Sequence, residues 1–280
     1  MCPIHNGEKV FRADGHGNSF VRLPGFWLRF TKKGSMFFLP YKDDNPTRSI
    51  PIVNWLLILV NLWVFFTWQF PLGPKEQMVY FSNFGFIPAT FFGQFFYPSV
   101  EGITWEWYSV VSSMFSHGGI AHLFGNMLFL YLYGDNLEDA MGKIRYLIFY
   151  LGCGLLAALA QAFLNPGSQI PMVGASGAIS GVIGGYLLLY PKANIRVFYW
   201  IFILIGTVMV PAYLVLGIWL LEQVLLFPES MKNAGGVAIA AHLGGFAGGF
   251  IMTPLFKKSG IQLFQDGHSR AFSRHPKRMR

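Results

Sequence analysis

Long apolar segments that contain almost no charged residues recur along this chain, separated by shorter polar ones. A helix needs about 20 apolar residues to cross the hydrocarbon core of a bilayer, which is roughly 30 Å thick. Two segments are shorter than this, and their moderately polar neighbours can complete them. The pattern predicts an all-α membrane protein with six transmembrane helices, which are expected over Ile52–Phe70, Ile120–Tyr133, Tyr146–Leu164, Ser176–Tyr190, Val197–Leu221 and Val237–Phe256.

The positions of Lys and Arg set the expected orientation in the membrane. All but two of the 21 Lys and Arg residues fall on one side of the expected helices, and the exceptions are Lys75 and Lys232. Because basic residues accumulate in cytoplasmic loops, both termini are expected in the cytoplasm. The net charge of +8 therefore reflects topology, and we expect contact with the lipid bilayer and no nucleic-acid partner.

This topology divides the chain into three parts. Residues 1–50 are expected to form a cytoplasmic N-terminal segment, residues 51–256 the membrane domain, and residues 257–280 a basic cytoplasmic tail. Residues 1–35 have scattered charges and no apolar core. We therefore expect either that they form a weakly structured extension or that the protein starts at Met36.

The few cysteines do not form a metal-binding pattern. Cys2, His5 and His16 lack the paired Cys-x2-Cys spacing of a structural zinc site. Cys153 lies inside the third apolar segment, so a disulfide with Cys2 is not expected. We expect no metal and no other cofactor.

Three apolar segments carry polar residues suited to acyl-transfer chemistry, and such groups within a membrane usually have a function. They are Ser176 in the run Gly-Ala-Ser-Gly, His242, and the pair His122 and Asn126 in the run His-x4-His-x3-Asn. At 1.5 Å per residue from the cytoplasmic end of each segment, Ser176, His242 and His122 lie at depths of ~24, ~22 and ~20 Å. The segments can therefore bring these side chains together.

A serine hydroxyl becomes a nucleophile when a base takes its proton, and a neutral His242 can do this for Ser176. No carboxylate is expected at this depth, because Glu222 would lie ~39 Å along the fifth helix, at the outer interface. A Ser-His dyad is therefore expected rather than a triad. The side chains of His122 and Asn126, with the backbone amide of Ser176, are candidate donors to an oxyanion. The alternative is that the two side chains only bridge helices.

Glycines predict that the helices of Ser176 and His242 pack closely. Gly-x3-Gly spacing forms a smooth face on which two backbones can approach. The glycines concerned are Gly177, Gly181 and Gly185 in one segment and Gly244, Gly245, Gly248 and Gly249 in the other.

Taken together, these motifs resemble the rhomboid intramembrane serine proteases over about Met36–Phe256. The motifs that carry the resemblance are Gly174-Ala175-Ser176-Gly177, Ala241-His242-x2-Gly245-x3-Gly249, His117-x4-His122-x3-Asn126, Gly134-x3-Glu138-x3-Gly142 and Asp44-Asn-Pro-Thr-Arg-Ser-Ile-Pro51. The resemblance implies that Ser176 is the nucleophile and His242 the base. It also implies that His122 and Asn126 line the oxyanion hole.

The resemblance further implies cleavage of the transmembrane segments of other membrane proteins near the outer leaflet, through an acyl-enzyme. The protein would then be a multi-pass protein of a bacterial inner membrane. Substrates would pass between the second and fifth helices, with the fifth helix and the loop Pro228–Gly236 acting as gate and cap. Pro211 is a candidate kink within the fifth helix.

Two positions depart from the family pattern. The first outer loop, about Pro71–Tyr108, contains no Arg, whereas some members carry a Trp-Arg pair there. Ser180 stands where some members place a Tyr four residues after the nucleophile. The contact that such a ring would give His242 must therefore come from elsewhere.

Two alternatives without proteolysis stay open: a non-catalytic rhomboid-like protein that binds transmembrane clients, and a small transporter whose polar residues line a path. Both predict that Ser176 is replaceable. An inactive relative would more naturally lack Ser176 or His242. A transporter would more naturally show carboxylates or repeated halves at the midplane, which the sequence does not suggest.

Overall fold

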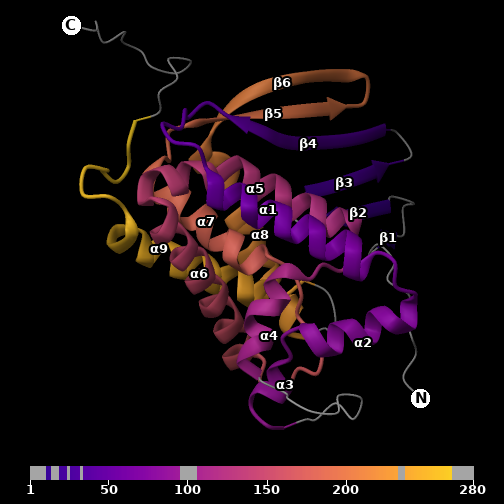
Figure 1. Cartoon of the computed structure of the whole chain (residues 1–280). Helices are drawn as coiled ribbons and strands as arrows, with labels where there is room; N and C mark the ends of the chain where they lie inside the picture. Colours follow the sequence, from indigo (N-terminus) through magenta and orange to yellow (C-terminus); the bar gives the residue numbers. More distant parts are fainter. Residues whose placement is uncertain are drawn as a thin grey trace, which may run out of the picture.

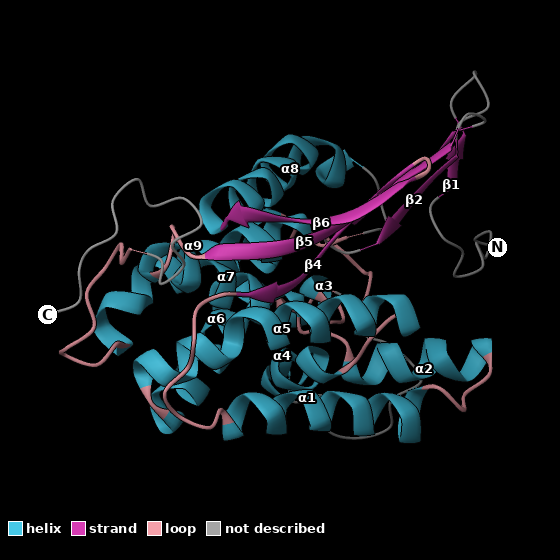
Figure 2. Cartoon of the chain, turned by 90° about the horizontal axis from the view of Figure 1, so that it is seen from above, coloured by secondary structure: helices cyan, strands magenta, loops and turns pink. Residues whose placement is uncertain are grey.

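The computed structural model describes residues 11–13, 19–23, 26–31, 34–94, 106–232 and 237–266. A bundle of helices makes up most of the molecule, and a twisted antiparallel sheet runs along one side of it (Figures 1 and 2). The described part is therefore mostly helical, but it is not all-α as the apolar pattern predicted.

Helices occupy all six predicted regions, but the second continues past its predicted end at Tyr133 to Met141, and the fifth has different bounds at both ends. They are α1 (Ile52–Val64), which continues as the π-helical η1 (Phe65–Gln69), α5 (Ile120–Met141), α6 (Lys143–Leu164), α7 (Ser176–Leu189), α8 (Ala212–Lys232) and α9 (Ile239–Phe256). Within the described ranges, four are long and apolar enough to cross a membrane: α1 with η1, α6, α8 and α9. Helix α7 has 14 residues and is shorter than these four.

Short helices fill the connection between η1 and α5. They are α2 (Pro74–Phe84), α3 (Pro88–Phe91), α4 (Glu106–Ser112) and the 3-10 helix η2 (Ser113–Phe115). Phe86 and Met172 exchange two backbone hydrogen bonds of 2.9 and 2.8 Å, so this connection is attached to the loop that precedes α7. Part of the first outer loop, residues 95–105, lies outside the described residues.

Glycines allow α7 and α9 to pack backbone to backbone, as their spacing predicted. A Cβ atom at Gly245 would overlap the carbonyl oxygen of Gly177, and one at Gly249 would overlap that of Gly181. Gly244 faces α6 in the same way, because a Cβ atom there would overlap a side chain of that helix. Helix α9 therefore lies in a narrow groove between α6 and α7, which fixes the position of every residue it carries.

The sheet contains six strands in the order β1-β2-β3-β4-β5-β6, all antiparallel to their neighbours. The strands are β1 (Phe11–Ala13), β2 (Ser19–Leu23), β3 (Phe26–Thr31), β4 (Gly34–Asp43), β5 (Asn194–Ile201) and β6 (Leu204–Pro211). Its members come from the N-terminal segment and from the connection between α7 and α8. The described residues of the N-terminal extension thus form strands that pair in series with β4, so the expectation of weak structure is wrong for them.

The predicted helix over Val197–Leu221 is wrong in its first part. This stretch begins inside the β5–β6 hairpin, whose turn places Phe202 at a φ of 55°. The run is rich in β-branched and aromatic residues, which favour strands over helices. Helix α8 begins directly after Pro211, so this proline ends a strand and does not kink a helix.

A buried polar network joins α1, α5 and α6 at the end of the bundle near the start of α1. The carboxylate of Glu138 accepts hydrogen bonds from the backbone N–H groups of Val53 (3.2 Å) and Asn54 (2.8 Å), which begin α1. The Asn54 side chain donates to the Leu130 carbonyl and accepts from the Tyr146 hydroxyl. Free N–H groups at a helix start require such acceptors when they are buried.

At the same end, Asp43 lies where β4 leaves the sheet. Its carboxylate accepts hydrogen bonds from the Tyr186 hydroxyl (2.9 Å) and the Asn136 side chain (3.0 Å). Burial, with the nearby charge of Asp135, raises the pKa of Asp43 to about 7. This carboxyl group therefore changes its charge near neutral pH.

Candidate active site

Ser176 is the first residue of α7, directly after a loop whose backbone is constrained. Gly174 in this loop has a φ of 126°, which a residue with a side chain rarely adopts. Its backbone N–H donates to the Ser113 carbonyl at 2.8 Å, which attaches the loop to η2. The loop and the helix start together present the Ser176 hydroxyl to the interior of the bundle.

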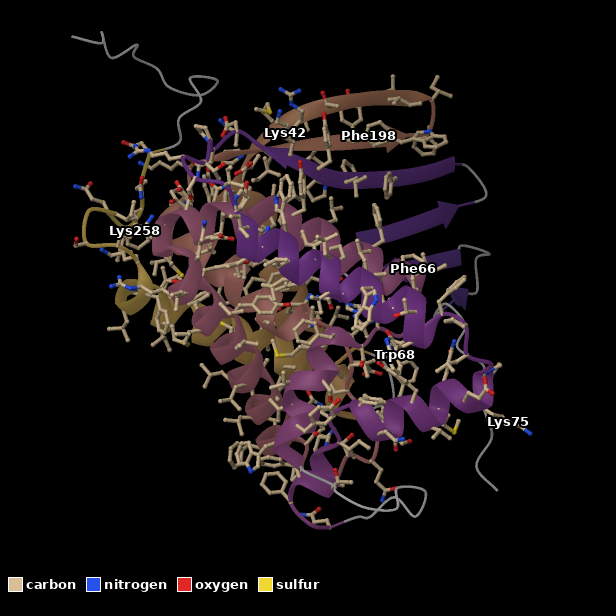
Figure 3. The ribbon with its side chains drawn as sticks, viewed as in Figure 1. Lys42, Phe66, Trp68, Lys75, Phe198 and Lys258 are labelled. Carbon is tan, nitrogen blue, oxygen red and sulfur yellow. The ribbon has the colours of Figure 1, made fainter. Side chains whose placement is uncertain are left out.

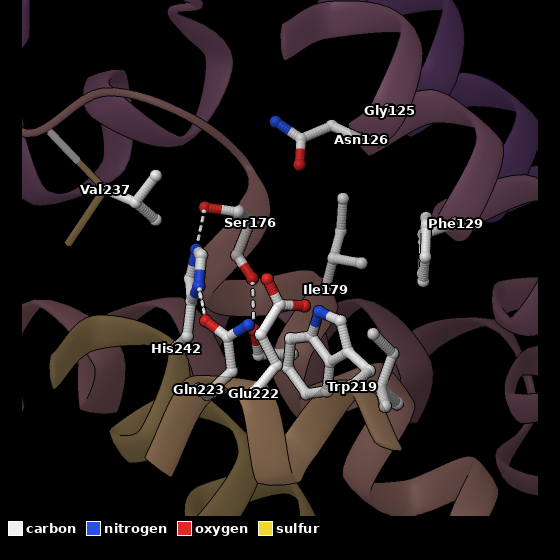
Figure 4. Close-up of a pocket in the computed structure, with 12 residues that line it drawn as sticks. Gly125, Asn126, Phe129, Ser176, Ile179, Trp219, Glu222, Gln223, Val237 and His242 are labelled. Atoms are coloured by element: carbon white, nitrogen blue, oxygen red, sulfur yellow. Dashed lines mark hydrogen bonds between the residues drawn. The ribbon is translucent and has the colours of Figure 1, made fainter. Parts of the chain in front are cut away.

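The structure brings Ser176 and His242 into direct contact, as their depths predicted. His242 Nε2 lies 2.8 Å from Ser176 Oγ, and the imidazole is buried with 6% of its surface exposed (Figure 4). The Trp219 ring packs near the imidazole, with ring centroids 6.3 Å apart. A serine hydroxyl and a histidine nitrogen within hydrogen-bond distance form the minimal arrangement for an activated nucleophile.

Helix α8 adds two polar residues that the sequence did not place here. Gln223 Oε1 lies 2.8 Å from His242 Nδ1, and the Gln223 side chain is 3% exposed. Glu222 lines the same pocket and points into it (Figure 4), so its predicted position at the outer interface is wrong. Because α8 begins at Ala212, Glu222 is ten residues into the helix, at ~15 Å along its axis.

A cavity of about 40 Å³ adjoins this group of residues. Its walls combine aromatic and aliphatic side chains with polar ones. The lining residues are Gly125, Asn126, Phe129, Ser176, Ile179, Ser180, Ile183, Trp219, Glu222, Gln223, Val237 and His242. Apolar walls with a few convergent polar groups are typical of sites that bind and orient a ligand.

Two potential donors from α5 face the loop before Ser176. His122 Nδ1 accepts a hydrogen bond from the Gly118 N–H (3.3 Å), so a neutral His122 carries its proton on Nε2. A Cβ atom placed on Gly174 would lie 2.7 Å from that Nε2 and 3.5 Å from Asn126 Nδ2. Asn126 is buried, and its Nδ2 has no acceptor in the described part of the chain. Both donors therefore border the space beside Gly174.

The remaining candidates have structural contacts. The Ser180 hydroxyl donates to the Ser176 carbonyl at 2.7 Å, so Ser180 lines the pocket and supports the first turn of α7. His117 is buried beside His122, with ring centroids 5.2 Å apart, and its backbone N–H donates to Gln69. The described residues contain no group of three or more His, Cys, Asp or Glu side chains that could hold a metal.

A family model described as Rhomboid domain matches residues 104–259 of the chain. The chain therefore belongs to the rhomboid family, whose members are generally serine proteases that act within membranes. This assignment, together with the apolar helices, makes it an integral membrane protein.

Three relatives illustrate the range of the family. A Bacillus subtilis protein named "Putative rhomboid protease YdcA" is 27% identical over 219 residues, which cover 78% of this chain and 94% of that protein. "Rhomboid protease GluP" of the same organism is 32% identical over 146 residues, or 52% of this chain and 25% of that protein. "RHOMBOID-like protein 12, mitochondrial" of Arabidopsis thaliana is 31% identical over 157 residues, or 50% and 44%. The chain thus spans nearly all of the first relative and less than half of the other two.

Proposed function

We propose that this protein is an intramembrane serine endopeptidase that cleaves the transmembrane segments of other membrane proteins. The observation that carries the proposal is the 2.8 Å contact between Ser176 Oγ and His242 Nε2 inside a bundle of apolar helices. A partly buried serine and a buried imidazole at this distance are suited to nucleophilic catalysis. Membership of the rhomboid family supports the same reaction.

In the proposed reaction, Ser176 Oγ attacks the carbonyl carbon of the scissile peptide bond while His242 Nε2 takes the hydroxyl proton. The resulting oxyanion accepts hydrogen bonds from His122 Nε2–H and Asn126 Nδ2–H. The tetrahedral intermediate collapses as His242 returns the proton to the leaving amine, which gives an acyl-enzyme on Ser176. Water, activated by His242 in the same way, then releases the second product.

Proposed substrates are membrane proteins with a helix that unwinds locally, because an intact helix keeps its carbonyl groups in internal hydrogen bonds. Small or helix-weakening residues near the cleavage site favour this unwinding. We propose that substrates reach the dyad between α5 and α8. The residues that end the predicted cap loop, Gly235 and Gly236, lie outside the described residues.

For the membrane topology, we propose that six helices cross a bacterial inner membrane with both termini in the cytoplasm. Lys42 and Lys258 lie toward one end of the molecule and Lys75 toward the opposite end (Figure 3), which agrees with the predicted asymmetry of basic residues. Phe66 and Trp68, labelled in the same figure, are 51% and 56% exposed, as lipid-facing side chains are. Residues 1–50, 51–256 and 257–280 remain the proposed division of the chain.

The experiment is cleavage of a tagged single-span substrate in proteoliposomes. Wild type is compared with Ser176→Ala and His242→Ala, and with Ser82→Ala as a matched control on the exposed helix α2. We expect cleavage by wild type and by the control, and none by the two dyad variants. Equal cleavage by Ser176→Ala would overturn the proposal that Ser176 is the nucleophile. No cleavage by wild type, together with no fluorophosphonate labelling of Ser176, would favour a protein that only binds transmembrane clients.

A further inference from the structure

We propose that Gln223 is a positioning residue that holds the catalytic base in the reactive tautomer, through the hydrogen-bonded chain Ser176–His242–Gln223. This inference rests on the proposed proteolytic function. It answers how His242 is oriented in a chain that has Ser180 where some relatives place a tyrosine.

The geometry of the imidazole carries the inference. Its two nitrogens have different partners: Nε2 lies 2.8 Å from Ser176 Oγ, and Nδ1 lies 2.8 Å from Gln223 Oε1. An amide oxygen only accepts, so His242 must donate from Nδ1. Its Nε2 is then unprotonated and can accept the proton of Ser176.

Because Gln223 is buried, its side-chain amide needs a hydrogen-bond partner within the protein. The side chain is 3% exposed, and a buried amide without a partner would destabilise the fold. The hydroxyl of Ser180 is bonded to the Ser176 carbonyl, and Trp219 faces the imidazole with a tilted ring. Gln223 therefore gives His242 Nδ1 a hydrogen-bond acceptor, whereas neither Ser180 nor Trp219 does so.

The charge of the side chain at position 223 should determine how the protonation of His242 depends on pH. Two titratable groups line pockets at this site: Glu222 from α8 shares one pocket with His242, and His122 from α5 shares another with Ser176. A neutral amide at Nδ1 orients the ring without adding charge. A carboxylate in its place would stabilise the imidazolium, so His242 would stay protonated up to a higher pH.

The experiment compares wild type with Gln223→Met, which removes the acceptor at similar volume, and Gln223→Glu, which keeps it and adds charge. Gln77→Met on α2 is the matched control. For each, kcat and KM for a single-span substrate and the rate of fluorophosphonate labelling of Ser176 are measured across pH. We expect Gln223→Met to lower kcat and the labelling rate by about 10²-fold with KM changed less than about twofold. We expect Gln223→Glu to recover most of kcat and to move the acid limb of the pH profile to higher pH.

Two results would overturn the role of Gln223 and leave the proposed function in place. One is a wild-type labelling rate in Gln223→Met, and the other is an acid limb of the pH profile that does not move in Gln223→Glu. The Gln223→Glu result decides the matter even if Gln223→Met fails to fold. A wild-type protein that neither cleaves nor labels would instead overturn the proposed function, and the inference with it.

Discussion

Adding one methyl group at Gly245 tests whether backbone contact between α7 and α9 positions the dyad. Gly245 follows His242 by three residues on α9, and its partner Gly177 follows Ser176 directly on α7. A Cβ atom at Gly245 would overlap the Gly177 carbonyl oxygen. The substitution Gly245→Ala therefore acts where the two helices carry the reacting groups.

The size of the effect follows from this overlap. Real Cβ atoms essentially never approach another heavy atom within 3.0 Å, so α7 and α9 must separate by about 1 Å at this point. Displacement of a catalytic group by about 1 Å can cost roughly 10²-fold in rate. Overpacking of a close contact also costs about 1–3 kcal/mol of stability.

The assay measures kcat/KM for a single-span substrate in proteoliposomes and the thermal midpoint in detergent. The matched control is Gly217→Ala on α8, where a Cβ atom meets no heavy atom within 4 Å. Both substitutions gain about 1 kcal/mol of helix propensity, so only the steric contact differs. We expect Gly245→Ala to lose about 10²-fold in kcat/KM and the control to keep wild-type activity. If Gly245→Ala stays within about twofold of wild type, the backbone contact does not position the dyad.

Three further changes test other parts of the structure. Asn126→Ala should lower kcat by about 10²-fold with little change in KM, because it removes a donor to the oxyanion; an unchanged kcat in the same cleavage assay would exclude that role. Glu138→Ala should destabilise the protein by about 2 kcal/mol or more, because it leaves two backbone N–H groups in the first turn of α1 without acceptors, and a thermal midpoint like that of wild type would contradict this. The carboxyl of Asp43 has a pKa raised from 3.8 to about 7, so its protonated form stabilises the fold at low pH and this contribution is lost as pH rises through 7. The thermal midpoint of Asp43→Asn, measured relative to that of wild type, should therefore rise as the pH is raised from 5 to 8. A difference that stays constant over this range would refute the argument.

The contact between Ser176 and His242 could be predicted from the sequence because both residues lie in regular apolar segments. In such helices, depth follows from a count of residues, and the glycine spacing shows which faces approach. Ser176 and His242 meet for these two reasons. The same spacing placed His122 and Asn126 on one face of α5, and both border the space beside Gly174.

The residues on α8 could not be placed correctly because the start of that helix was wrong. An apolar run of this composition fits either a membrane helix or a strand hairpin, and hydropathy alone does not separate them. A helix that starts at Val197 moved Glu222 to the outer interface, and Gln223 was not predicted as a site residue at all. The dense β-branched and aromatic residues before Pro211 were the signal that could have moved the helix start to Ala212. The pairing of β4 with β5 joins distant parts of the chain and has no local signal.

The most direct test of the central claim is to identify, by mass spectrometry, the residue that a fluorophosphonate modifies in the membrane-embedded protein. An activated serine reacts, whereas an ordinary serine does not. We predict a single adduct on Ser176, lost in His242→Ala. An adduct on another serine, or on Ser176 to the same extent in His242→Ala, would contradict the claim that His242 activates Ser176.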